Sequence, residues 1–145
     1  AGTGSEAALA IETLLASAND LRLQDVSRAM ILASAAREIL QAIDKAGLPV
    51  ALVKGVDFAE KAYGGLQMRS FSDIDLLVRP EAAEALGSLL QGLGLEAHEP
   101  PDKRIDYTER QWTWAHEHGG SLLVEVHTDV VHAPELRARQ TLTYD

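Results

Sequence analysis

Apolar residues recur at helical spacing along the first third of the chain. Residues 5–17 and residues 25–46 each carry an apolar stripe with polar positions between its members. The stripes consist of Ala8, Ile11, Leu14 and Leu15 in the first segment and of Leu32, Ala36, Ile39, Leu40 and Ile43 in the second. We therefore predict two packing helices, separated by an interruption at Asn19-Asp20 and ended by Gly47.

Shorter apolar runs follow, bounded by glycine and proline. Residues 50–53 and 73–78 are rich in β-branched and aliphatic residues and predict strands, the first of them buried. A helix is expected over 56–63 and another from Pro80 to about residue 93, because proline suits the first position of a helix. Residues 95–97 are compatible with a short strand, and residues 99–106 are predicted to form a loop.

The pattern near the end of the chain predicts a β-hairpin. Residues 111–118 and 121–126 form two β-prone runs around Gly119-Gly120, which suits a two-residue turn. The expected cross-strand pairs are His118 with Ser121, Trp114 with Glu125 and Trp112 with His127. Because side chains alternate along a strand, Glu125 and His127 share one face with Leu123, and the flanking apolar residues share the other.

Together these elements predict an α/β (α+β) fold. A small mixed sheet carries residues 50–53, 73–78 and 122–127, and helices pack on one of its faces. We expect a single domain over residues 1–145, with N-terminal helices (1–47) that extend from or pack on a core (48–130). Residues 131–145 are interpreted as the start of a further C-terminal part.

Composition narrows the possible functions. The net charge of −9 argues against unspecific nucleic-acid binding, which needs a basic surface. The chain has no cysteine, so disulfides and thiolate metal sites are excluded. No apolar run reaches membrane-spanning length, and the sequence shows no signal-peptide pattern, so a cytoplasmic protein is expected.

Two acids at the start of one strand are the strongest candidate for chemistry. Asp73 and Asp75 alternate with Ile74, so both carboxylates point to the same face, with Cα atoms roughly 6–7 Å apart. Carboxylates at that separation can converge on one Mg²⁺, or on a pair of ions roughly 3.5–4 Å apart. The alternative is a strand that begins with two solvated acids.

Two further positions fit a phosphate and metal site. Lys54-Gly55 lies at a predicted strand-to-helix turn, where free N–H groups and the helix dipole favour phosphate; the alternative is a tight turn with an exposed lysine. Glu125 interrupts an apolar strand, and a buried acid needs a partner such as a metal ion. The alternative for Glu125 is an edge-strand carboxylate that faces solvent.

These pieces, in this order, resemble the nucleotidyltransferase superfamily that includes DNA polymerase beta. More closely, they are similar to the bacterial family of uncharacterised nucleotidyltransferases. Family members read Leu-Lys-Gly, then Arg-x-x-x-Asp-Ile-Asp-Leu-Leu-Val, then an acid-x-His segment. Here the corresponding stretches are Leu52-Val53-Lys54-Gly55, Arg69 to Val78, and Glu125-Val126-His127, so the resemblance covers residues 49–127.

The resemblance implies a polymerase beta-like fold and metal-dependent transfer of a nucleoside monophosphate. Asp73 and Asp75 would hold two Mg²⁺ (or Mn²⁺) ions, and Glu125 would complete the second metal site and accept the proton of the acceptor hydroxyl. The substrates would be an NTP, ATP being the first candidate, and an unidentified small molecule or protein.

The same resemblance assigns the residues that would hold the nucleotide. Lys54, Gly55 and Arg69 would neutralise the triphosphate and the leaving pyrophosphate. His127, two residues after Glu125 on the same face, is either a donor to one of the metal-binding carboxylates or a packed or surface histidine.

Several alternatives stay open from the sequence. Lys54-Gly55 replaces the Gly-Ser usual in the superfamily, and Glu125 replaces an aspartate, so a non-catalytic nucleotide- or partner-binding relative is one alternative. A toxin-like transferase that acts on RNA is a second, which the acidic charge disfavours. Trp112 and Trp114 either stack a base or pack in the core. The spacing of the hairpin histidines disfavours zinc.

Overall fold

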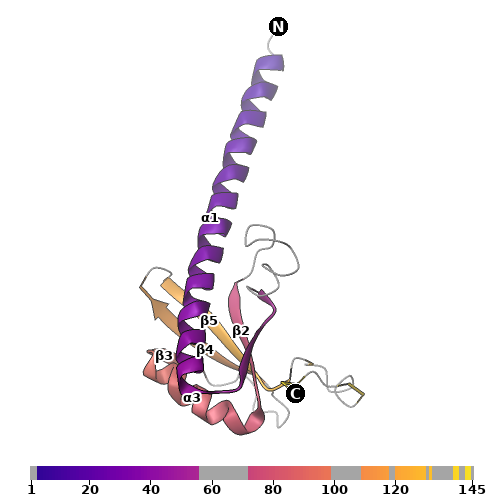
Figure 1. Cartoon of the computed structure of the whole chain (residues 1–145). Helices are drawn as coiled ribbons and strands as arrows, with labels where there is room; N and C mark the ends of the chain where they lie inside the picture. The colour runs from indigo at the N-terminus through magenta and orange to yellow at the C-terminus, as the bar shows by residue number, and fades with distance from the viewer. Residues whose placement is uncertain are drawn as a thin grey trace.

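The described residues form a five-stranded mixed sheet with helices (Figure 1). The computed structural model describes residues 3–55, 72–98, 109–117, 120–129, 131, 139–140 and 143–144, with side chains from residue 8 onward. The strands are β1 (Val50–Val53), β2 (Asp73–Val78), β3 (Leu95–Ala97), β4 (Glu109–His116) and β5 (Gly120–His127). The helices are α1 (Thr3–Ala46), the 3-10 helix η2 (Pro80–Ala82) and α3 (Ala83–Gly92). The α+β class predicted from the sequence is confirmed.

The strand order within the sheet is β1-β2-β5-β4-β3. Strands β2 and β5 are parallel, and the other described pairs are antiparallel. The expected strands at 50–53, 73–78 and 95–97 are therefore present. The predicted burial of β1 is wrong: its four residues are half-buried because β1 is an edge strand that pairs with β2 alone.

A single helix, α1, spans the whole first third of the chain. The predicted interruption at Asn19-Asp20 is wrong. Asn and Asp lower helix propensity by only about 0.7 kcal/mol each, whereas glycine or proline is usually needed to break a long helix. The predicted end is confirmed, because Gly47 follows α1 with a φ of +65°, a left-handed conformation that suits glycine.

The core lies between one face of the sheet and the helices. The second half of α1 and the helix α3 pack on the face formed by the alternating apolar residues of β2, β4 and β5. These buried strand residues are Ile74, Leu76, Val78, Trp112, Trp114, Leu122, Val124 and Val126. The packing interpretation of the tryptophans is confirmed, because Trp112 and Trp114 are 4% and 7% exposed.

The hairpin is present, but its predicted register is wrong by three residues. Trp114 lies opposite Leu122, and Gln111 lies opposite Glu125. His116 pairs with Gly120, which begins β5 with a φ of +64°. The observed register differs from the predicted one by an odd number of residues, which moves both tryptophans from the site face to the core face of the sheet. It is preferred because the tryptophans are buried there against apolar partners.

Some expectations lie outside the described residues. These are the helix over 56–63, the loop over 99–106, Arg69 and most of the segment 131–145. In the described part of the chain, no helix has both the length and the apolar character needed to cross a membrane.

Candidate functional site

The site lies on the sheet face opposite the core and begins with β2. Alternation along this strand sends Ile74, Leu76 and Val78 into the core and leaves Asp73 and Asp75 on the other face, as predicted. In the parallel register between β2 and β5, Asp75 lies directly opposite Glu125. Two carboxylates from neighbouring strands are thereby placed side by side.

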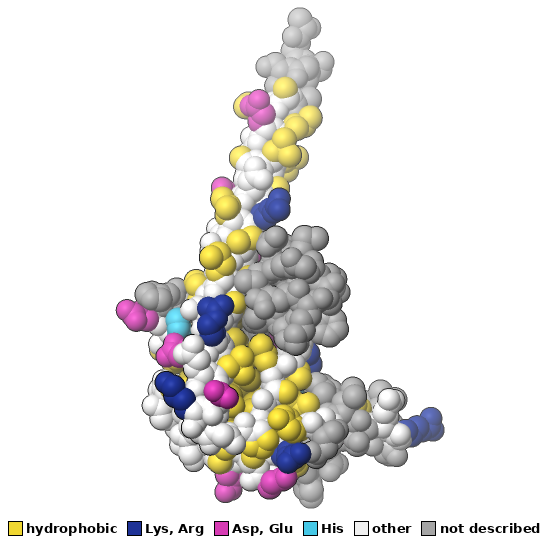
Figure 2. Space-filling model, in the orientation of Figure 1, with side chains coloured by type: hydrophobic (Ala, Val, Ile, Leu, Met, Phe, Trp, Pro, Cys, Tyr) yellow, Lys and Arg dark blue, Asp and Glu magenta, His cyan; other side chains and the backbone are white. Residues whose placement is uncertain are grey.

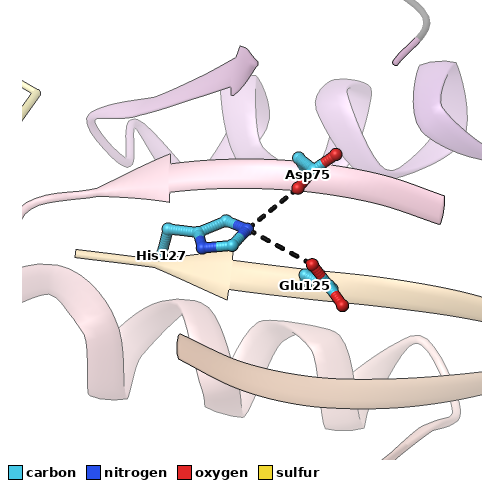
Figure 3. A group of neighbouring side chains, drawn as sticks. All are labelled: Asp75, Glu125 and His127. Carbon is cyan, nitrogen blue, oxygen red and sulfur yellow. Dashed lines mark hydrogen bonds and ion pairs between the residues drawn. The ribbon is translucent and has the colours of Figure 1, made fainter. Parts of the chain in front are cut away.

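His127 joins these two acids (Figure 3). Its Nε2 lies 2.9 Å from Oδ1 of Asp75 and 3.6 Å from Oε2 of Glu125. The side chain of His127 is completely buried, and that of Asp75 is nearly so. One ligand atom from each of the three residues lies within 4.8 Å of the others, so the group is compatible with a shared metal ion.

Lys54 reaches the same aspartate from the end of β1. Its Nζ lies 3.0 Å from Oδ1 of Asp75, and its side chain is 42% exposed. Lys54 has a φ of +55°, which is uncommon for a residue with a side chain, and Gly55 follows it in a buried position. Backbone strain of this kind concentrates at functional sites, where the surrounding structure maintains it.

The environment of Asp75 fixes its ionisation. Burial alone would raise the pKa of Asp75, but the hydrogen bonds from His127 and Lys54 outweigh burial and hold its pKa below the usual value. An ionised carboxylate only accepts hydrogen bonds, so Nε2 of His127 carries the hydrogen and donates it to Oδ1.

The other two acids behave in the opposite way. Burial, and then the negative charge of Asp75, raise the pKa of Asp73. Burial, and then the charges of Glu109, Asp73 and Asp75, raise the pKa of Glu125. Like charges therefore accumulate on this face beyond what Lys54 neutralises, and a bound cation would relieve the repulsion.

Two residues of the site were not identified from the sequence. Gln111 Nε2 donates to Oε1 of Glu125 at 3.1 Å and to Oε1 of Glu109 at 3.2 Å. Glu109 also places Oε2 3.8 Å from Nδ1 of His127. The observed hairpin register would have revealed both, because Glu109 pairs with His127 and Gln111 with Glu125.

The donor chemistry suits a hard divalent cation. Carboxylate oxygens are the preferred ligands of Mg²⁺ and Mn²⁺, and Asp75 and Glu125 offer them from adjacent strands. His127 is directed to Asp75 through a hydrogen bond, which is how residues around a metal site orient its carboxylates. Lys54 shares Oδ1 of Asp75, so a cation there would have to share or replace that contact.

The predicted site residues differ in how the structure places them. Asp75, Glu125, His127 and Lys54 lie together; Asp73 is on the same face but is not part of the three-residue group. Gly55 follows Lys54 directly, and Arg69 lies outside the described residues. His116 lies 3.7 Å from Glu38 of α1, away from the site.

This fold and this group of side chains are consistent with a nucleotidyltransferase-like protein. The family model described as "Uncharacterised nucleotidyltransferase" matches residues 6–144. The chain therefore belongs to this family, which supports a nucleotidyltransferase type of function and an NTP as substrate. No curated protein and no solved structure matches the chain.

Proposed function

We propose that the protein is a metal-dependent nucleotidyltransferase, which transfers a nucleoside monophosphate from an NTP, with ATP as the first candidate, to a hydroxyl of a small molecule or protein. The observation that carries the proposal is the pairing of Asp75 with Glu125 across two parallel strands, with His127 directed at both. This pairing places acidic oxygens from separate parts of the chain within reach of one cation.

Asp75 and Glu125 are proposed to hold the cation, and Asp73 to contribute from the same face. A divalent cation bound there supplies charge stabilisation for phosphate oxygens and lowers the pKa of a hydroxyl. The ionised Asp75 is suited to permanent ligation. Glu125 is proposed to accept the proton of the acceptor hydroxyl as well as to ligate the cation.

The remaining residues are proposed to hold the triphosphate. Lys54 presents a half-exposed ammonium group next to Asp75, and Gly55 allows close approach to the backbone. Arg69 completes this set by resemblance to the family motif. In the transfer, the acceptor oxygen forms a bond to the α-phosphorus, the bond to the bridging oxygen breaks, and pyrophosphate leaves. The hydroxyl proton passes to Glu125.

One observation favours a second candidate, a non-catalytic relative that binds nucleotide or a partner. Lys54 occupies Oδ1 of Asp75 at 3.0 Å, the position that a metal ion would be expected to take. If the lysine permanently replaces the ion, the fold is retained and the nucleotidyl transfer activity is lost.

Transfer of label separates the two candidates. The protein is incubated with Mg²⁺, each of the four NTPs labelled at the α-phosphate, and small-molecule or protein fractions of a lysate. We expect label in a product with the wild type and with Glu96→Gln, which alters an exposed acid on β3. Asp75→Asn should abolish it. Nucleotide binding without transfer in every fraction would favour the non-catalytic relative.

A further inference from the structure

The first half of α1 carries apolar side chains that the described part of the protein does not cover. The helix projects beyond the sheet, and hydrophobic side chains lie exposed along this projection (Figures 1 and 2). The large ones are Leu9 (65% exposed), Ile11 (57%), Leu14 (69%), Leu15 (60%), Leu21 (62%) and Leu23 (65%). Helices that expose apolar residues in this way usually have a partner.

Most of these residues continue the helix face that packs on the sheet. Ile11, Leu14, Leu15, Ala18 and Leu21 each precede a buried residue of α1 by 18 positions, which is about five turns of an α-helix. The corresponding buried residues are Ala29, Leu32, Ala33, Ala36 and Ile39. The same pattern of positions thus forms the core contact in the second half of α1 and lies exposed in the first.

We infer that Ile11, Leu14, Leu15, Ala18 and Leu21, hereafter the exposed stripe, form an antiparallel interface with a second copy of this chain. The first argument is continuity, because the exposed stripe extends an apolar interface that already packs tightly against the sheet. The second is self-complementarity, because a two-fold axis brings the same stripe from each copy together and closes the assembly at two chains.

The structure also determines the orientation. From Ala29 onward this face of α1 is covered by the sheet of its own chain. Two parallel helices meeting through this face would therefore force the two sheets into the same space. In the antiparallel arrangement the two sheets lie at opposite ends, and the helices pair through residues 8–22, about 22 Å at 1.5 Å per residue, which precede the first contact of α1 with the described sheet residues at Leu23–Arg28.

The spacing of the exposed stripe defines a register. Ile11, Leu14, Ala18 and Leu21 follow the alternating three- and four-residue steps of helix pairs. The antiparallel pairing places Ile11 opposite Leu21 of the second copy and Leu14 opposite Ala18, with Leu15 beside the two-fold axis. Large side chains thereby face small ones at two of the layers, which favours close packing of the helices.

A membrane surface is a poorer match for the same face. Helices that lie on membranes carry lysine or arginine in excess on their polar side. Residues 8–25 carry Glu12, Asp20 and Asp25 against a single Arg22, and the whole chain has a net charge of −9. A second copy of the chain satisfies the exposed stripe without needing basic residues.

Sedimentation equilibrium of the full chain tests the inference. We expect a concentration-dependent monomer–dimer equilibrium for the wild type and for a control, Leu9→Glu with Leu23→Glu, whose residues are as exposed but lie off the stripe. Leu14→Glu with Leu21→Glu should give monomer at every concentration, with an unchanged melting temperature of the sheet. A monomeric wild type, or equal behaviour of the two double variants, would overturn the inference, as would binding to lipid vesicles by a monomeric wild type.

Cross-linking tests the orientation, because the chain has no cysteine of its own. Ile11→Cys and Leu21→Cys are prepared separately and treated with a short bis-maleimide. A mixture of the two variants should give covalent dimers, and each variant alone should give few. Efficient cross-linking of Ile11→Cys with itself would indicate parallel helices and contradict the antiparallel interface.

Discussion

His127 and Asp75 lie 52 positions apart in the sequence, yet Nε2 of His127 donates a 2.9 Å hydrogen bond to Oδ1 of Asp75. Both side chains are buried, so the contact connects the end of β5 to the centre of β2 within the protein. It keeps a negative charge stable at a position where burial would otherwise favour the neutral acid.

Removal of the imidazole should therefore destabilise the fold. We expect His127→Ala to lower the free energy of unfolding by about 1.5–3 kcal/mol, the range for a hydrogen bond to a charged group. Urea denaturation measures this change. His98→Ala, at an exposed position after β3, is the control and should have a smaller effect. Equal effects of the two variants would mean that the contact with Asp75 contributes nothing to stability.

Asp73 and Asp75 should respond to pH in opposite ways in the metal-free protein. Asp73 has a raised pKa, so its contribution to stability is present below its unfolded pKa and is lost as pH rises through the folded pKa. Asp73→Asn should therefore stabilise the protein at pH 7, and the gain should vanish as the acid becomes protonated.

Asp75 has a lowered pKa, so its contribution is present above its unfolded pKa and is lost as pH falls through the folded pKa. Asp75→Asn should destabilise the protein at pH 7, and this effect should decrease as pH falls below the ordinary pKa of an aspartate and through the lowered pKa of Asp75. Melting temperatures across this pH range, with a chelator present, measure both variants. Shifts of the same sign at pH 7 would contradict the assigned pKa directions.

Lys54 should have separable effects on nucleotide and on metal. Lys54→Met should weaken NTP binding by about 1.5–3 kcal/mol, because a charged hydrogen bond to phosphate is lost. It should strengthen binding of Mn²⁺ alone, since the ammonium group no longer competes for Oδ1 of Asp75. Folding stability should also fall, because the buried carboxylate of Asp75 loses a charged hydrogen-bond donor.

Calorimetric titration of the Lys54→Met variant with Mn²⁺ and with Mn²⁺–ATP measures both affinities. Lys45→Met, which removes an exposed lysine at the end of α1, is the matched control. Unchanged NTP affinity in Lys54→Met would show that the turn after β1 does not bind phosphate.

Gln111 should matter because it orients Glu125. Gln111→Leu removes the donor to Oε1 of Glu125 and leaves the two acids, Glu109 and Glu125, to repel each other. We expect Mn²⁺ affinity to fall by about 10-fold or more, as for other residues that orient metal ligands. Thr113→Val, the next residue on the same face of β4, is the control because Thr113 lies opposite Leu123. Equal affinities would assign Gln111 a packing role only.

Local pattern was sufficient to predict the strands and the faces of β2. The alternation of Asp73, Ile74 and Asp75 directly determined which side chains reach the core, and Gly47 marked the end of α1. The continuity of α1 across Asn19-Asp20 could not be predicted from local preference, because two weak helix formers do not outweigh a long helical context.

The sequence predicted only those features of the site that depend on a single strand, and not the pairing between strands. The hairpin register depends on burying two tryptophans at once, a tertiary requirement that the glycine pair alone does not encode. The wrong register placed Trp114 next to Glu125 and so concealed Gln111. The choice between a packed and a site-directed His127 also needed the parallel pairing of β2 with β5, which joins distant parts of the chain.

The central claim is that the acids of β2 and β5 form a functional metal and nucleotide site. Thermal melting with and without Mn²⁺, and with each of the four NTPs, tests it without knowledge of the acceptor. A ligand at 100 times its dissociation constant stabilises a fold by about 2.7 kcal/mol, so the wild type should melt at a clearly higher temperature. Asp75→Asn should abolish most of the shift, and Glu125→Gln should reduce it less. If the wild type shows no shift with millimolar Mn²⁺ and any NTP, the claim is contradicted.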